Sequence, residues 1–133
     1  MDTPVKEVVR EMTRASDEER ISFPEVVKAL MAVGVERYHA DLITGTKIYF
    51  MPDGSHEPTS SYATAETGIA FSAKGVEQAV RAVQRGEIGY RTFCDRIAAA
   101  GCVGYLVSLV GQQVLYYGRS NENHVEWFPG AKP

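Results

Sequence analysis

The sequence lacks the features that define several large functional classes. Lys and Arg number 14 against 17 Asp and Glu, and no basic run occurs, so nucleic acid and membrane surfaces are not expected as partners. It has no Gly-rich strand-to-helix turn, which leaves phosphate binding unsupported. The N-terminus is polar, mixed in charge and unlike a secretory leader. We therefore expect a cytoplasmic protein.

Cysteine is also scarce. The two cysteines, Cys94 and Cys102, form no Cys-x-x-Cys pair, and Cys94 shares a helical stripe with Phe93 and Ile97. Both are expected to pack as small apolar residues rather than to act as nucleophiles. A disulfide between them stays open at this point.

Charge is absent from one long stretch, Ile97 to Gly118. It is long enough to cross a bilayer, but four glycines and Gln112-Gln113 interrupt it. We predict a helix end followed by a buried hairpin there.

What is present fits one globular domain. Of the 133 residues, 44% are hydrophobic and 23% charged. We treat residues 1–133 as a single domain, with 1–20 as a peripheral N-terminal helix and 52–70 as a long polar loop. Apolar residues at helical spacing predict four amphipathic helices, in Val5–Met12, Phe23–Met31, Val76–Val83 and Tyr90–Ile97. Ser22 and Glu25 form a capping-box pattern at the start of the second helix.

Alternating patterns predict a first hairpin from Val35–Leu42 to Thr46–Met51. We favour a three-residue loop that pairs Leu42 with Thr46, because this register separates polar from apolar residues. One face then carries His39, Asp41, Lys47 and Tyr49, and the other carries Tyr38, Ala40, Leu42, Ile48 and Phe50.

A second group of strands follows the fourth helix. It comprises Val103–Val110, a Gly111-Gln112 turn, Gln113–Gly118 and His124–Phe128. The order of elements predicts an α+β fold, in which about five mostly antiparallel strands are covered on one side by about four helices. This order suggests a helix-helix-sheet unit used twice, although no residue-level repeat stands out.

Two strand segments carry the same polar chemistry. His39 and Asp41 lie two residues apart, as do His124 and Glu126, and this spacing puts each pair on one face of its strand. Together the four side chains would suit a divalent metal or general acid/base chemistry. The alternative is that they are solvated sheet residues, with Asp41 pairing across to Lys47.

Strand aromatics offer a second candidate surface. Tyr49 and Tyr117 would lie on a binding face, as aromatics do at interfaces, or would belong to the core. For Tyr105 and Tyr116 the core is the better interpretation.

Several motifs together resemble a known family. They are Phe23-Pro24, Gly34-Val35-Glu36-Arg37-Tyr38, Phe93-Cys94, Ala100-Gly101-Cys102-Val103-Gly104-Tyr105, Tyr117-Gly118-Arg119, and His124-Val125-Glu126 followed by Phe128-Pro129. Over residues 21–129 the chain resembles the YbcV-like family of small uncharacterised bacterial and prophage proteins, some of which are labelled phage envelope protein. The resemblance implies a small α+β domain and no catalytic residues.

The function we expect is a non-enzymatic interaction module that binds a protein or a small molecule and needs no cofactor. A homodimer, formed through the open sheet face or a sheet edge, is one such arrangement. The alternative is a small metal-dependent or acid/base enzyme that uses His39, Asp41, His124 and Glu126. A third alternative, a phage-related structural or accessory protein, depends on the family label.

Overall fold

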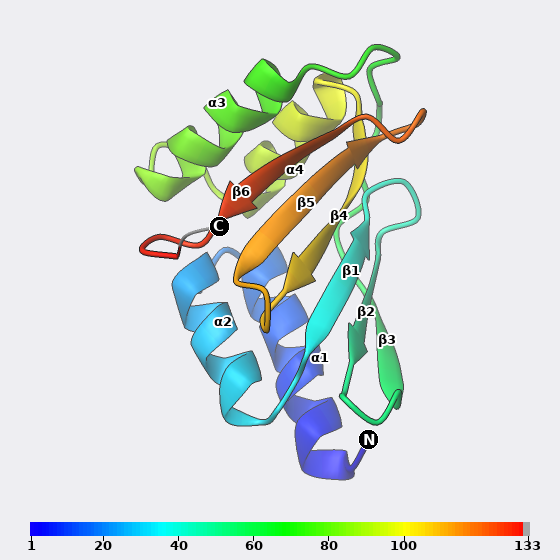
Figure 1. The fold of residues 1–133 in the computed structure, drawn as a ribbon, viewed down its shortest axis with the longest axis vertical. Helices are drawn as coiled ribbons and strands as arrows, with labels where there is room; N and C mark the ends of the chain where they lie inside the picture. The colour runs from blue at the N-terminus through cyan, green and yellow to red at the C-terminus, as the bar shows by residue number, and fades with distance from the viewer. Residues whose placement is uncertain (132–133) are drawn as a thin grey trace.

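A computed structural model describes residues 1–131 as one sheet with helices on one side (Figure 1). The helices are α1 (Thr3–Asp17), α2 (Phe23–Ala32), α3 (Ala73–Gln84) and α4 (Tyr90–Ala99). The strands are β1 (Arg37–Asp41), β2 (Thr46–Phe50), β3 (His56–Ser60), β4 (Cys102–Ser108), β5 (Gln113–Gly118) and β6 (Asn123–Trp127). The predicted α+β class is confirmed.

The sheet has six strands rather than about five, in the order β3-β2-β1-β4-β5-β6, and every neighbouring pair is antiparallel. The additional strand, β3, lies inside the segment 52–70 that was predicted to be a polar loop. It is an edge strand with Pro58 at its centre and no run of apolar residues. Proline is tolerated at a sheet edge, where its missing N–H leaves no ladder bond unmade.

The predicted register of the first hairpin is wrong by one residue. Tyr38 pairs with Tyr49 and Asp41 with Thr46, so the loop spans residues 42–45. Lys47 and Tyr49 therefore face the helices, and Ile48 faces the opposite side. A one-residue slip moves every side chain of a strand to the other face.

The second hairpin also has a longer loop than predicted, because Ser108 rather than Val110 pairs with Gln113. This shift of two residues leaves the predicted faces unchanged. The strands of this hairpin and the end of α4 occupy Ile97–Gly118, as the sequence indicated. Within residues 1–131, the helices are all too short or too polar to cross a membrane.

The two halves of the sheet share one pairing register. Tyr38 pairs with Tyr49 in the first half, and Tyr105 pairs with Tyr116 in the second, each number being raised by 67 (38 to 105, 49 to 116). Every pair between β1 and β2, and between β2 and β3, recurs in this way between β4 and β5 and between β5 and β6. The chain is thus two ααβββ units, joined where β1 meets β4.

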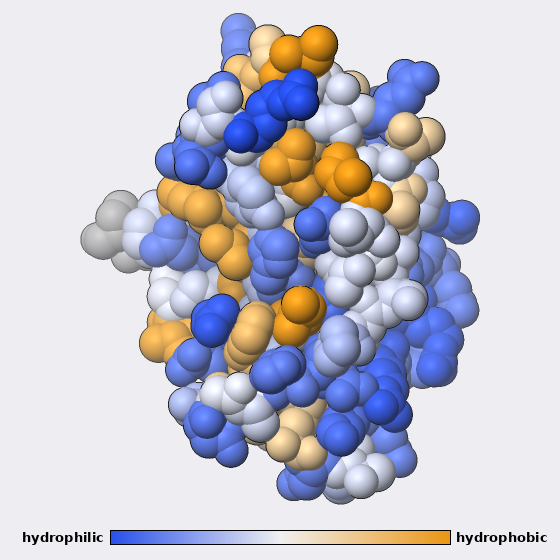
Figure 2. All heavy atoms as spheres, turned by 90° about the vertical axis from the view of Figure 1, so that its right-hand side faces the viewer, coloured by the Kyte–Doolittle hydropathy of each residue, from blue (hydrophilic) through white to orange (hydrophobic). Residues whose placement is uncertain are grey.

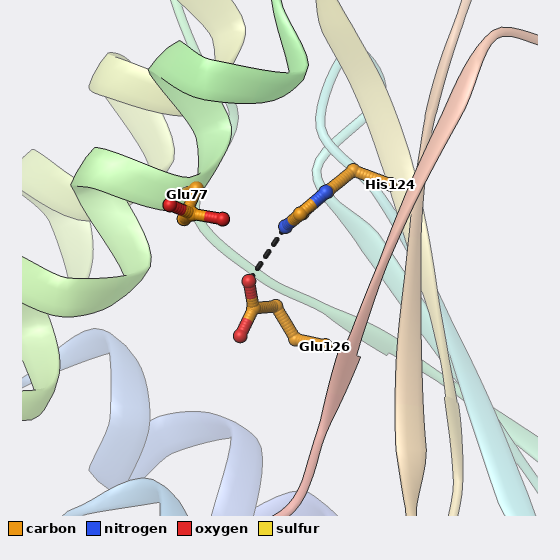
Figure 3. Close-up of side chains that lie close together, drawn as sticks. All are labelled: Glu77, His124 and Glu126. Carbon is orange, nitrogen blue, oxygen red and sulfur yellow. Dashed lines mark hydrogen bonds and ion pairs between the residues drawn. The ribbon is translucent and has the colours of Figure 1, made fainter. Parts of the chain in front are cut away.

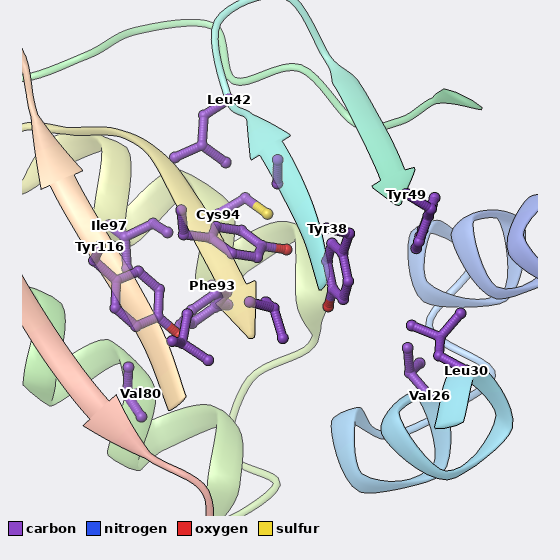
Figure 4. Packing of buried hydrophobic residues seen from close by; sticks show 14 of the residues in the cluster. Val26, Leu30, Tyr38, Leu42, Tyr49, Val80, Phe93, Cys94, Ile97 and Tyr116 are labelled. Carbon is purple, nitrogen blue, oxygen red and sulfur yellow. The ribbon is translucent and has the colours of Figure 1, made fainter. Parts of the chain in front are cut away.

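The core lies between the sheet and both helix pairs. In Figure 4, Val26 and Leu30 of α2 lie near Tyr49, while Phe93 and Ile97 of α4 lie near Tyr116. Residues 1–20 are less peripheral than predicted, because Val5 and Val9 of α1 belong to this core. The capping box at the start of α2 is present: Ser22 Oγ accepts from Glu25 N, and Ser22 N donates to the Glu25 carboxylate.

Candidate functional site

The four polar residues predicted to form one site lie on opposite faces of the sheet. His39 and Asp41 are on the face without helices, which we call the open face, and they belong to a central strand. His124 and Glu126 face the helices from the outer strand β6, and β4 and β5 separate them from β1. The two pairs therefore cannot act on one ion or one substrate.

On the open face, His39 is held by Tyr117 rather than by a carboxylate. His39 Nε2 and the Tyr117 hydroxyl share a hydrogen bond of 2.6 Å, and the two rings stack at 5.9 Å between centroids. Gly104 lies between them on β4, and a Cβ there would overlap the Tyr117 hydroxyl. Partial burial lowers the pKa of His39, while nearby Asp41 opposes the shift.

Asp41 itself has a local structural role. Its Oδ1 accepts hydrogen bonds from the backbone N–H groups of Ile43 and Thr44, at 2.9 and 3.0 Å, and so closes the hairpin loop. The alternative in which Asp41 pairs with Lys47 is wrong, because Lys47 faces the core.

On the covered face, Glu126 is the centre of a polar cluster. His124 Nε2 donates to Glu126 Oε2 at 2.6 Å, and Arg81 of α3 donates to Oε1 at 2.9 Å. The Glu126 side chain is 10% exposed and that of His124 is 18% exposed. A buried charge needs partners, and these two hydrogen bonds hold the Glu126 carboxylate in place.

Glu77 of α3 completes the cluster (Figure 3). A ring nitrogen of His124 and one carboxylate oxygen each from Glu77 and Glu126 all lie within 4.8 Å of one another. The three side chains line an open groove of about 440 Å³ between α3 and β6. Sequence analysis did not identify Glu77, because only the packing of α3 on β6 brings it to His124.

The two tyrosines proposed as binding-face aromatics also separate. Tyr117 is half-buried on the open face, whereas Tyr49 is 1% exposed on the covered face. The Tyr49 hydroxyl shares a hydrogen bond of 2.9 Å with Thr13 of α1, so it belongs to the core. Tyr105 and Tyr116 are buried there as well.

Neither cysteine is suited to nucleophilic catalysis. Both are buried and free, and burial raises the pKa of each thiol to about 11. A thiol in that state is a poor nucleophile near neutral pH.

The open face is a second candidate surface, and among the described strands it carries few charges. Its side chains are Arg37, His39, Asp41, Thr46, Ile48, Phe50, His56, Pro58, Ser60, Leu106, Ser108, Gln113, Leu115, Tyr117, Asn123, Val125 and Trp127. Only one cation, Arg37, and one carboxylate, Asp41, belong to this set. Figure 2, the view from the right of Figure 1, shows hydrophobic side chains in several groups with polar ones between them.

The comparisons with known proteins identify a family of unknown function. No curated protein matches the chain. The family described as "Protein of unknown function (DUF1398)" matches residues 11–126, most of the chain. The YbcV-like and phage labels stay predictions. The chain belongs to the DUF1398 family, whose function is unknown.

Proposed function

We propose that this protein is a non-enzymatic interaction module that pairs with a second copy of itself through the open face. The observation that carries the proposal is the scarcity of charge on that face, which no helix of residues 1–131 covers. Depletion of charged residues, with aromatic and aliphatic side chains in their place, is typical of the centre of a protein interface.

One row of side chains crosses the middle of this face. Pairing aligns His39 with Ile48 on one side and with Leu106 on the other, and Leu106 continues to Leu115 and Val125. Leu106 is 39% exposed, which is unusual for a large aliphatic side chain at the centre of a sheet. Such a row would bury its apolar area against a partner.

A second copy is the partner that the charges favour. Arg37 and Asp41 have opposite signs, so two such faces meet without net repulsion. Six strands spaced by about 4.8 Å, each at least five residues long, form a rectangle of roughly 500 Å². This is less than the roughly 800 Å² per partner of a standard stable interface, so we expect a weak, concentration-dependent dimer.

Sedimentation velocity from about 10 μM to about 1 mM tests the proposal. The wild-type protein should shift toward dimer over this range, and Leu106→Lys should stay monomeric, because it places a charge at the centre of the contact. Met31→Lys is the matched control, since Met31 is an exposed hydrophobic residue of α2, on the helix side. A wild-type protein that is monomeric throughout would refute the proposal, as would equal effects of the two variants.

A further inference from the structure

We infer that Glu77, His124 and Glu126 form a binding site for a divalent first-row metal ion such as zinc. The ligand set is one imidazole and two carboxylates, which suits zinc, iron or manganese. The three ligand atoms lie within 4.8 Å of one another, so modest side-chain rotations would bring each of them to about 2.1 Å from one ion. The ion would replace the proton that His124 Nε2 donates to Glu126.

The two halves of the chain provide an internal comparison for this site. A groove of about 540 Å³ between α1 and β3 corresponds to the groove between α3 and β6. Each has an arginine that follows a buried valine, Val9 or Val80, and reaches a glutamate of the outer strand. Arg10 bonds Glu57 at 2.6 Å in the first half, and Arg81 bonds Glu126 at 2.9 Å in the second.

An arginine–glutamate pair is therefore common to both grooves. The second groove adds a histidine, His124, and a helix glutamate, Glu77; the first groove has Asp17 and Glu18 at the C-terminal end of α1 but no histidine among its lining residues. By the shared register, His124 corresponds to Glu57, and Glu126 corresponds to Thr59. Glu77 directly follows a buried valine, Val76, where the first half has Lys6 after Val5. A lysine there would repel a cation.

Glu77 has no structural partner that would explain its position. It is exposed and makes no hydrogen bond or ion pair within residues 1–131, yet its carboxylate lies beside His124 (Figure 3). The groove beside the three residues is open, so an ion and its water ligands can enter. Three protein ligands with an open side are the arrangement of zinc sites that bind a further ligand.

Arg81 modulates the site without ligating the ion. Its guanidinium bonds mainly Glu126 Oε1, at 2.9 Å, and lies 3.5 Å from Oε2. The other oxygen stays available to an ion, but the positive charge of Arg81 opposes cation binding. Removing that charge should therefore tighten binding, which a purely structural cluster would not show.

The test is titration of untagged, metal-free protein with ZnCl₂ by isothermal calorimetry, followed by elemental analysis after dialysis. We expect one zinc per chain in the wild-type protein, no stoichiometric zinc in Glu77→Gln or His124→Ala, and tighter binding in Arg81→Gln. Glu57→Gln and His56→Ala are the controls, since they change a carboxylate of the other groove and a histidine of the open face.

Two outcomes would overturn the site: no stoichiometric zinc in the wild-type protein, or equal binding by wild type and Glu77→Gln. Circular dichroism of each metal-free variant checks that it is folded. Should His124→Ala unfold, Glu77→Gln still decides, because Glu77 is exposed and holds nothing in place.

Discussion

At the scale of single residues, Lys47 is the most unusual feature of the core. It is 3% exposed, and its ammonium lies 4.3 Å from the centroid of the Tyr90 ring. Burial lowers the pKa of Lys47 to about 8 from its ordinary 10.5, and nearby Cys94 and Asp17 oppose the shift. In the second half, the corresponding position in the register is Val114, an apolar residue.

Replacing Lys47 with Met should stabilise the protein at neutral pH. Between pH 8 and 10.5 the unfolded chain binds more protons at Lys47 than the folded chain, so the wild type gains stability as pH rises through this window. Below pH 8, Lys47 is charged in both the folded and the unfolded chain, so the full free-energy cost of burying the charge lowers the stability of the wild type. Because the Tyr90 contact offsets part of it, Lys47→Met should raise the free energy of unfolding at pH 7 by roughly 1 to 3 kcal/mol.

Urea denaturation of both proteins at pH 7 and at pH 10 measures this difference, which should shrink at the higher pH. The exposed Lys74→Met in α3 is the control and should change little. A variant less stable than wild type at pH 7 would show that Lys47 has a net favourable role.

At the scale of elements, the two hairpins show how strand register decides which side chains face the core and which face the open side of the sheet. Their predicted pairings were both displaced, one by a single residue and the other by two. Only the first displacement moved side chains to the other face of the sheet, and it placed Lys47 and Tyr49 in the core. Loop length depends on how the hairpin packs on its neighbours, and local alternation alone did not fix it.

Helix α2 depends on its capping box, which was predicted from the sequence because all its atoms lie within four residues. Ser22→Ala should lower the free energy of unfolding by about 1 kcal/mol, since it removes the acceptor for Glu25 N. Thermal unfolding measures the loss. Ser60→Ala is the control, because the side chain of this exposed residue of β3 makes no hydrogen bond within residues 1–131. Equal effects of the two changes would contradict the capping role.

At the scale of the whole molecule, the two ααβββ units share one sheet and one core. The β1–β4 pairing joins them, and the core cluster draws on helices of both. The order of elements suggested this repeat, but no residue-level repeat stood out because only spaced positions match, such as Tyr38 with Tyr105 and Tyr49 with Tyr116. The equivalence of these tyrosines follows from the shared pairing register.

A shared core predicts that the two units unfold together. The single tryptophan, Trp127, reports on the outer strand of the second unit, whereas far-ultraviolet circular dichroism reports on the helices of both. Urea transitions followed by the two signals should coincide. A tryptophan transition at lower urea than the dichroism transition would mean that the second unit unfolds separately.

Residue patterns along the chain were enough to predict the α+β class, the four helices with the α2 cap, and the shared face of His124 and Glu126. These features depend on spacing within a short segment, where periodicity and hydrogen bonding are local. The separation of β1 from β6 and the place of Glu77 beside His124 became known only from the three-dimensional packing. Those facts depend on contacts between segments distant in the chain, and no local pattern records which strand or helix will be the neighbour.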